Sequence, residues 1–150
     1  MKLKHLKHTY TLDFFAVDDE MASTIPMFSD AVQAGFPSPA KDHMDMDLNL
    51  NDHLVQNPST TFCVKAIGES MKDAGIQSGD IMIVDKSLEP RNRSIVLAVI
   101  DGEFTVKRVN MNENELYLMP ENNSFSPIKI TKEMDFQVWG IVTYIIHKAV

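Results

Sequence analysis

Ser70 and Lys107 are the side chains of this sequence whose surroundings best suit nucleophilic chemistry. Ser70 lies in a glycine-bracketed turn after a predicted strand, with Gly68, Glu69 and Met71 as its neighbours. A serine at such a turn exposes its hydroxyl, and the backbone N–H groups around it are free to bind an oxyanion. The other role for this serine is to cap a short helix, which serine favours. The hydroxyl needs a base before it becomes a nucleophile.

Histidine, the usual base for a serine nucleophile, does not stand in a recognisable motif. The five histidines lie in the first residues, in a polar middle stretch and beside the C-terminus. The nucleophile-elbow pattern G-x-S-x-G is also absent, because position 72 is lysine. A Ser-His-Asp triad is therefore not favoured.

Lysine is the alternative base, and Lys107 has the right surroundings. It lies between Val106 and Arg108 in an apolar segment that we expect to form a largely buried strand. Free lysine has a pKa of about 10.4, and burial lowers it by disfavouring the charged form. Lowering it by about 3 units costs roughly 4 kcal/mol, which a folded core can offset. The alternative is that Lys107 extends into solvent from a strand edge.

The elements that would position these residues are predominantly strands. Short alternating or continuous apolar runs, bounded by turn residues, predict strands at 60–67, 81–84, 95–100, 103–109, 116–119 and 138–146. The runs at 81–84 and 95–100 are typical of strands buried on both faces, and Asp101-Gly102 predicts a tight hairpin turn. One short helix is expected within 48–55. The predicted fold class is mainly β.

The first 34 residues differ from the rest, so we divide the chain there. They mix basic, acidic and apolar residues without a sustained period, Pro26 interrupts them, and Pro37 and Pro39 follow. We interpret residues 1–34 as a flexible, extended or weakly ordered arm, and residues 35–150 as a β-rich domain. The arm is too short for a helix-turn-helix domain.

Composition narrows the class of protein and its compartment. The chain has 150 residues, and 14 Lys and Arg stand against 21 Asp and Glu, which disfavours direct DNA binding. Cys63 is the single cysteine, so no intramolecular disulfide forms and a reducing compartment is expected. No apolar run reaches the length of about 20 residues that spans a membrane, and no signal peptide is recognised. We expect a cytoplasmic protein without a metal ion or cofactor.

Four motifs occur together in an order that resembles a known family. They are G-x-S-M at 68–71, G-I-x-x-G-D at 75–80, E-F-T-V-K-R at 103–108, and a region with Phe28-Ser29-Asp30 followed by Ala34 to Ala40. Together they resemble the UmuD-type proteins of SOS mutagenesis, over roughly residues 26 to 147. More broadly they resemble the self-cleaving domain shared with LexA and the lambdoid phage repressors. The resemblance implies a LexA/signal-peptidase-like β-ribbon fold with a Ser–Lys dyad.

The resemblance implies specific roles for the motif residues. Ser70 becomes the nucleophile, Lys107 the general base, and the peptide bond between Ala34 and Gly35 the bond that the domain cuts in its own arm. Alanine is small enough for a tight pocket, and glycine has no Cβ to obstruct the attack. The alternative for this pair is an ordinary helix end at Gly35. One departure is Arg93-Ser94, which stands where the family more often has a glycine-containing turn.

The resemblance also implies partners. The RecA filament on single-stranded DNA would stimulate cleavage, and the trimmed form, residues 35–150, would join a UmuC-like subunit in translesion DNA synthesis. A homodimer is implied as well, and exposed strand edges make it plausible. Cleavage by the same chain and cleavage by the other chain of the dimer both remain open.

Three other classes remain as alternatives. A phage- or LexA-type repressor would need a DNA-binding domain, for which the first 34 residues are too few. A signal-peptidase-like enzyme acting on other proteins would need a membrane anchor. A non-catalytic binding module would keep the fold and lose the chemistry.

Overall fold

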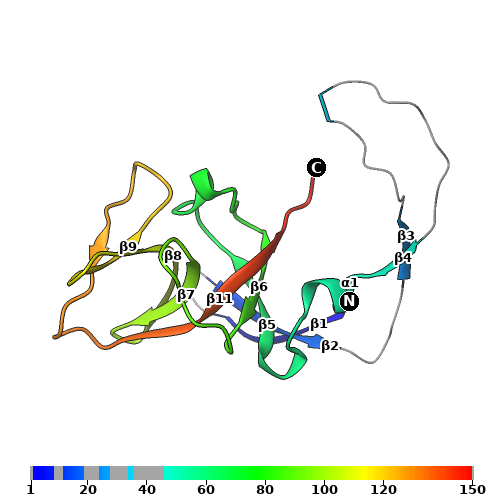
Figure 1. Ribbon diagram of the computed structural model, residues 1–150, viewed down its shortest axis with the longest axis horizontal. Helices are drawn as coiled ribbons and strands as arrows, with labels where there is room; N and C mark the ends of the chain where they lie inside the picture. The colour runs from blue at the N-terminus through cyan, green and yellow to red at the C-terminus, as the bar shows by residue number, and fades with distance from the viewer. Residues whose placement is uncertain (1, 9–11, 19–23, 28–33, 36–45, 150) are drawn as a thin grey trace.

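The computed structural model describes residues 2–8, 12–18, 24–27, 34–35 and 46–149, and most of them lie in antiparallel strands (Figure 1). The strands are β1 (Lys2–His8), β2 (Leu12–Asp18), β3 (Thr24–Met27), β4 (Met46–Asn49), β5 (Thr61–Ala66), β6 (Ile81–Asp85), β7 (Ile95–Ile100), β8 (Glu103–Met111), β9 (Leu116–Met119), β10 (Ile128–Lys129) and β11 (Phe136–Ile146). The prediction of a mainly β fold is confirmed.

Nine of these strands form one sheet in the order β1-β2-β5-β6-β11-β7-β8-β9-β10, and every neighbouring pair is antiparallel. Strands β3 and β4 pair with each other as a separate ribbon, which Figure 1 shows beside the short helix at the right of the molecule. The last long strand, β11, lies between β6 and β7 and therefore joins the two halves of the large sheet.

Two hydrophobic clusters form the core, and β7 contributes to both. Leu97 belongs to one cluster, whereas Val96 and Ala98 belong to the other. Successive side chains of a strand point to opposite faces, so the continuous apolar run at 95–100 serves both faces of the sheet. The run that became β6 is buried in the same manner. Both interpretations as doubly buried strands are confirmed.

The turn that joins β7 to β8 follows the expected chemistry. Ile100 pairs with Glu103, and the two residues between them, Asp101 and Gly102, have φ angles of 48° and 83°. Positive φ at both central positions is the mark of a two-residue hairpin of type I′. This turn fixes the register of β8, which carries Lys107.

A second backbone feature lies before β7, at Arg93-Ser94, where the family that the motifs resemble more often has a glycine-containing turn. Arg93 has a φ of 74°, a left-handed conformation that favours glycine. Its backbone is held on both sides: its N–H donates to the Val109 carbonyl at 2.8 Å, and its carbonyl accepts from Arg108 Nη1 at 2.8 Å. These bonds stabilise a conformation that is unusual for arginine.

Among the residues that the structure describes, helices are few and short. They are α1 (Leu50–Leu54), which Asn49 caps by accepting from the Asn51 and Asp52 N–H groups, and two 3₁₀ turns at Pro58–Thr60 and Lys72–Ala74. The helix expected within 48–55 is therefore confirmed. In the part of the chain that the structure describes, no helix has the length and apolar content to cross a bilayer.

The N-terminal residues are more regular than we expected. Strands β1 and β2 form a hairpin, and β2 pairs along β5 as part of the large sheet. Leu12 and Phe14 are buried in the first core cluster. The interpretation of this region as extended holds for the backbone of β1 and β2. Within residues 12–18, two buried apolar side chains hold β2 against the sheet.

Candidate active site

Ser70 lies in the loop between β5 and β6, just before the 3₁₀ turn at Lys72–Ala74. Gly68 has a φ of 104°, which glycine adopts without strain and which turns the chain away from β5. The residue at the N-cap position of the 3₁₀ turn is Met71, and no side chain caps that turn. The capping role considered for Ser70 is therefore wrong, and its hydroxyl is available for another partner.

That partner is Lys107. Its Nζ lies 3.0 Å from Ser70 Oγ, 2.9 Å from Thr105 Oγ1 and 3.0 Å from the Val106 carbonyl oxygen. Thr105 and Lys107 are two residues apart in β8, so their side chains leave the strand on the same face. Lys107 is only 8% exposed, so the alternative in which it extends into solvent is wrong.

Lys107 Nζ lies within donor distance of three oxygens, which can be satisfied with or without a charge on the amine. In its neutral form the amine has two N–H donors and one lone pair, so it can donate to Thr105 Oγ1 and to the Val106 carbonyl and accept from the Ser70 hydroxyl. Burial lowers the pKa of Lys107 below its ordinary value, because desolvation disfavours the ammonium form. Among the described residues, no carboxylate forms an ion pair with Lys107 to restore the charge. The site can therefore hold a base next to a hydroxyl.

A segment distant in the sequence holds the Ser70 turn in place. The Glu121 N–H donates to the Ser70 carbonyl at 2.8 Å, and the Asp73 N–H donates to the Glu121 carbonyl at 2.7 Å. Asn122 Nδ2 donates to the Glu69 carbonyl at 2.9 Å. The Glu121 carboxylate is also paired with Arg108, the residue after Lys107 in β8. The serine turn and the lysine strand are thus tied to one segment.

The backbone N–H groups around Ser70 differ in whether they already donate a hydrogen bond. The Gly68 N–H donates to Ser78 Oγ at 3.2 Å, so it supports the turn rather than an oxyanion. Within the described residues, the N–H groups of Glu69, Ser70 and Met71 have no hydrogen-bond acceptor. Met71 itself is buried beneath the turn. The donors that remain for an oxyanion are those of Glu69, Ser70 and Met71.

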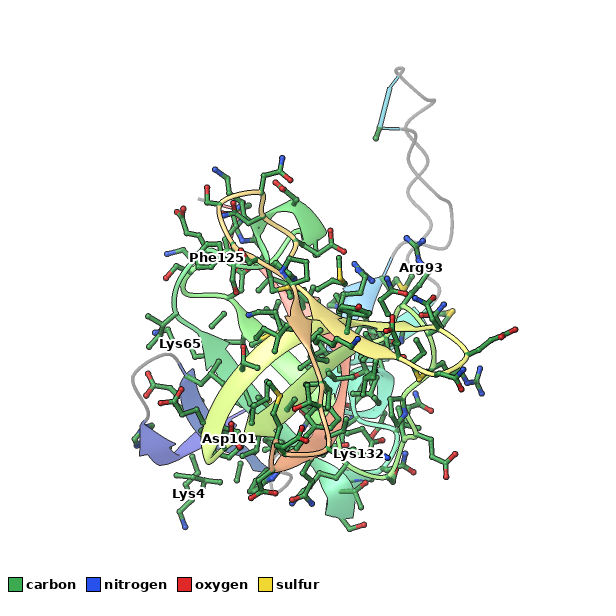
Figure 2. All side chains as sticks on the ribbon, turned by 90° about the vertical axis from the view of Figure 1, so that its left-hand side faces the viewer. Lys4, Lys65, Arg93, Asp101, Phe125 and Lys132 are labelled. Atoms are coloured by element: carbon green, nitrogen blue, oxygen red, sulfur yellow. The ribbon has the colours of Figure 1, made fainter. Side chains whose placement is uncertain are left out.

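A pocket of about 490 Å³ opens beside the serine and the lysine. The residues that line it from other parts of the fold include Leu12 of β2, Asp101 of the β7–β8 turn, Phe104 of β8, Phe125, and Ile128 of β10. Figure 2 labels Phe125 in the upper left and Asp101 in the lower left of the view. The pocket is mostly apolar around the two polar groups, as small-ligand sites commonly are.

The predicted scissile bond is not in this pocket. Ala34 and Gly35 are both exposed, and neither lines the pocket. A Cβ built on Gly35 would have no heavy atom within 4 Å beyond its chain neighbours. The motif residues around them, 28–30 and 36–40, lie outside the described residues. The structure therefore brings Ser70 and Lys107 together but leaves Ala34 and Gly35 apart from them.

The sequence analysis missed the residues that support the contact between Ser70 and Lys107. Thr105 had a signal, because it stands two positions before Lys107 on a predicted strand and so shares its face. Glu121 and Asn122 had none, since the turn that they hold lies about fifty residues earlier in the chain, and no local pattern reports such a pairing.

Comparison with known proteins agrees with the motifs. Residues 26–143 match the family described as Peptidase S24-like. The chain is 44% identical to protein SamA of Salmonella typhimurium over 130 residues, which cover 87% of this chain and 90% of SamA. It is 40% identical to protein ImpA of Escherichia coli, covering 82% of this chain and 83% of ImpA. It is 39% identical to protein MucA of Escherichia coli, covering 81% and 83%. The resemblance inferred from the motifs is confirmed.

Proposed function

This chain belongs to the peptidase S24-like family, and we propose that it is a self-cleaving regulator of the SOS response that hydrolyses its own bond between Ala34 and Gly35. The observation that carries the proposal is the 3.0 Å contact between Lys107 Nζ and Ser70 Oγ in a buried setting. A serine activated by a neutral lysine needs this contact, and it needs the lowered lysine pKa that burial provides.

In the first step, neutral Lys107 takes the hydroxyl proton of Ser70, and Oγ bonds to the carbonyl carbon of Ala34. The carbonyl oxygen becomes an oxyanion, which the Ser70 and Met71 N–H groups can bind because they have no other acceptor among the described residues. The Lys107 ammonium then gives its proton to the Gly35 nitrogen. The C–N bond breaks, and Ala34 remains as an ester on Ser70.

In the second step, Lys107 is neutral again and takes a proton from a water molecule. The hydroxide attacks the ester carbon, the bond between that carbon and Ser70 Oγ breaks, and the proton on Lys107 returns to Oγ. The carboxylic acid of Ala34 is released and loses its proton to solvent. Thr105 and the Val106 carbonyl hold the amine in position through both steps, because they accept its two other N–H groups.

The Ala34–Gly35 bond has to move into the pocket before either step, because it is exposed and unseated in this structure. The fraction of molecules with the bond seated then sets the rate. A partner that stabilises the seated form acts as the trigger. On the family resemblance, we propose that this partner is the RecA filament, and that residues 35–150 act afterwards with a UmuC-like subunit, as a homodimer in the cytoplasm.

The test is to incubate the purified chain at about pH 10, where lysine loses its proton readily, and at neutral pH with and without activated RecA. A fragment that begins at Gly35 supports the proposal. Ser70→Ala, Lys107→Ala and Lys107→Arg should each abolish this fragment, the last because guanidinium stays protonated. Lys132→Ala, which changes an exposed lysine (labelled in Figure 2), is the matched control and should cleave normally.

A chain that stays intact under all of these conditions would instead identify a non-catalytic binding module. Gly35→Val tests the assigned bond: it should slow the cut, because a branched side chain obstructs the approach of Ser70. Unchanged cleavage in Gly35→Val would mean that another bond is cut.

A further inference from the structure

The hairpin of β1 and β2 is a feature of this chain that the family match does not include, since the match begins at residue 26. Both strands precede the Ala34–Gly35 bond in the chain. Strand β2 nevertheless pairs with β5, which follows that bond. A cut at Ala34–Gly35 would therefore separate two strands of one sheet covalently while they remain hydrogen-bonded neighbours.

Strand β2 is held by two apolar side chains on one face. Leu12 pairs with Ala66 and Phe14 pairs with Val64 in the β2–β5 register. Leu12 is 3% exposed and Phe14 is 5% exposed, so both are as buried as the central core. Apolar residues at alternate positions, inserted beside an edge strand, are the usual way in which a strand binds an extended peptide.

The Phe14 ring lies in an aromatic socket formed by Phe62 and Phe104. Its centroid is 6.2 Å from that of Phe62, in a stacked arrangement, and 4.8 Å from that of Phe104, edge to face. Phe62 lies on β5 and Phe104 on β8, so the socket belongs wholly to the part of the chain after residue 35. Aromatic pairs of this geometry add to the energy of burial.

Strand β1 contributes little to this attachment. It lies at the end of the sheet and pairs only with β2 among the described strands. Lys4, labelled at the lower left of Figure 2, and Leu6 are exposed on it. The hairpin is thus attached through β2, and above all through Leu12 and Phe14.

We propose that the edge of β5 and its aromatic socket form a peptide-binding site, and that residues 12–18 stay bound there as part of a separate peptide after the bond between Ala34 and Gly35 is cut. The ligand class is an extended peptide, antiparallel to β5, with large apolar side chains two positions apart. That residues 12–18 occupy this site as a cleaved peptide rests on the proposed function, whereas the existence of the binding site on β5 does not.

This site has a consequence for the pocket at Ser70. Leu12 lines that pocket as well as pairing with β5. The cut ends the covalent attachment and so lowers the effective concentration of the hairpin at its site. Leu12 continues to line the pocket until the peptide dissociates. Dissociation of the peptide is therefore a separate step that follows hydrolysis of the bond.

The test uses the full chain with Ser70→Ala, so that self-cleavage plays no part, and with a recognition sequence for an added site-specific protease in place of residues 36–41. After complete digestion, the native mixture is separated by size-exclusion chromatography and its peak is analysed by mass spectrometry. We expect the N-terminal peptide to elute with residues of the main domain. Elution of the peptide by itself would overturn the proposal, whatever the outcome of the self-cleavage experiment.

Two matched variants of the same digested complex test the socket. Phe14→Ala should speed exchange of the bound peptide for a labelled synthetic peptide of residues 1–34 by about 100-fold or more, since it removes a buried ring. Phe15→Ala removes a ring on the opposite face of β2, where it contacts His5 within the hairpin, and should change exchange by less than about 5-fold. Equal effects of the two variants, or no effect of Phe14→Ala, would contradict the assigned socket.

Discussion

At the scale of single residues, the state of Lys107 decides what the pocket can do. Its amine is buried, and its partners are a hydroxyl, a second hydroxyl and a carbonyl, which can all be satisfied without a positive charge. Burial lowers the pKa of Lys107. The fraction of neutral amine at a given pH is therefore larger than for a lysine in water, and the reaction should follow that fraction.

The rate of self-cleavage should rise with pH and reach a plateau as Lys107 loses its proton. Because the pKa of Lys107 lies below its ordinary value, the midpoint of this rise should fall below about pH 10.4. The measurement is the initial rate of appearance of the fragment that begins at Gly35, from about pH 6 to pH 11. A midpoint at or above the ordinary lysine value would show that this amine is not the base.

Asn122 should act as a positioning residue for the serine turn, because its Nδ2 donates to the Glu69 carbonyl at 2.9 Å. Asn122→Ala removes this bond and also the bond that its Oδ1 accepts from the Ser124 N–H at 2.9 Å. Loss of the bond to Glu69, which supports the serine turn, should slow cleavage by about 5- to 10-fold. The midpoint of the pH profile should stay unchanged, since Lys107 keeps its partners. Asn123→Ala, at the exposed neighbour, is the control. An equal loss of rate in both variants would point to a general effect on this loop.

At this scale, the sequence predicted that Ser70 and Lys107 would meet, but it did not predict the residues that hold them in place. A glycine turn before Ser70 and a buried strand around Lys107 are local patterns, and the family motifs contain both. The bonds from Glu121 and Asn122 join segments that only the folded sheet brings together. Residue types alone carry no information about such partners.

At the scale of elements, the strands that are buried on both faces were the most predictable. β6 and β7 appear as continuous apolar runs, and the turn at 101–102 has its own signature. The hairpin of β1 and β2 was missed for a physical reason. Its inward residues, Leu12 and Phe14, alternate with Asp13 but then meet Phe15 on the outer face, so the period-2 pattern ends after three positions.

Strand β11 depends on a glycine where it passes from β7 to β6. A Cβ on Gly140 would lie 2.6 Å from Val84 Cγ1 and 3.0 Å from the Asp85 carbonyl oxygen. Gly140→Ala should therefore lower the free energy of unfolding by about 1–3 kcal/mol, as overpacking does. Chemical denaturation of the Ser70→Ala chain measures this.

Gly35→Ala in the same chain is the control, because a Cβ there meets nothing within 4 Å. It should leave the free energy of unfolding unchanged to within about 0.5 kcal/mol. If Gly140→Ala were equally neutral, the close approach of β11 to β6 would not be as the structure describes it.

At the scale of the whole molecule, burial of Lys107 links the stability of the fold to pH. The unfolded chain binds a proton at this lysine up to its ordinary pKa, whereas the folded chain releases it at a lower pH. Between the two values the unfolded state holds more protons, so the contribution of Lys107 to the free energy of unfolding becomes more favourable as pH rises.

To isolate this effect, the free energy of unfolding of the Ser70→Ala chain is compared with that of a double variant that carries Ser70→Ala and Lys107→Met. The methionine chain should be the more stable at neutral pH, because it buries no ionisable group. The difference should shrink as pH rises through the lowered pKa of Lys107 and become constant above about pH 10.4. Urea denaturation at several pH values gives both curves. A difference that does not change with pH would mean that Lys107 titrates alike in both states.

The aromatic contacts of the hairpin extend further than its own socket. Phe104, which packs against Phe14, also packs edge to face against Trp139 at 4.9 Å between centroids, and Trp139 is the single tryptophan of the chain. The fluorescent indole of Trp139 is therefore separated from Phe14 of β2 only by the Phe104 ring. The unlabelled protein should thus signal departure of the strand as a change in its intrinsic fluorescence, in real time and without a dye.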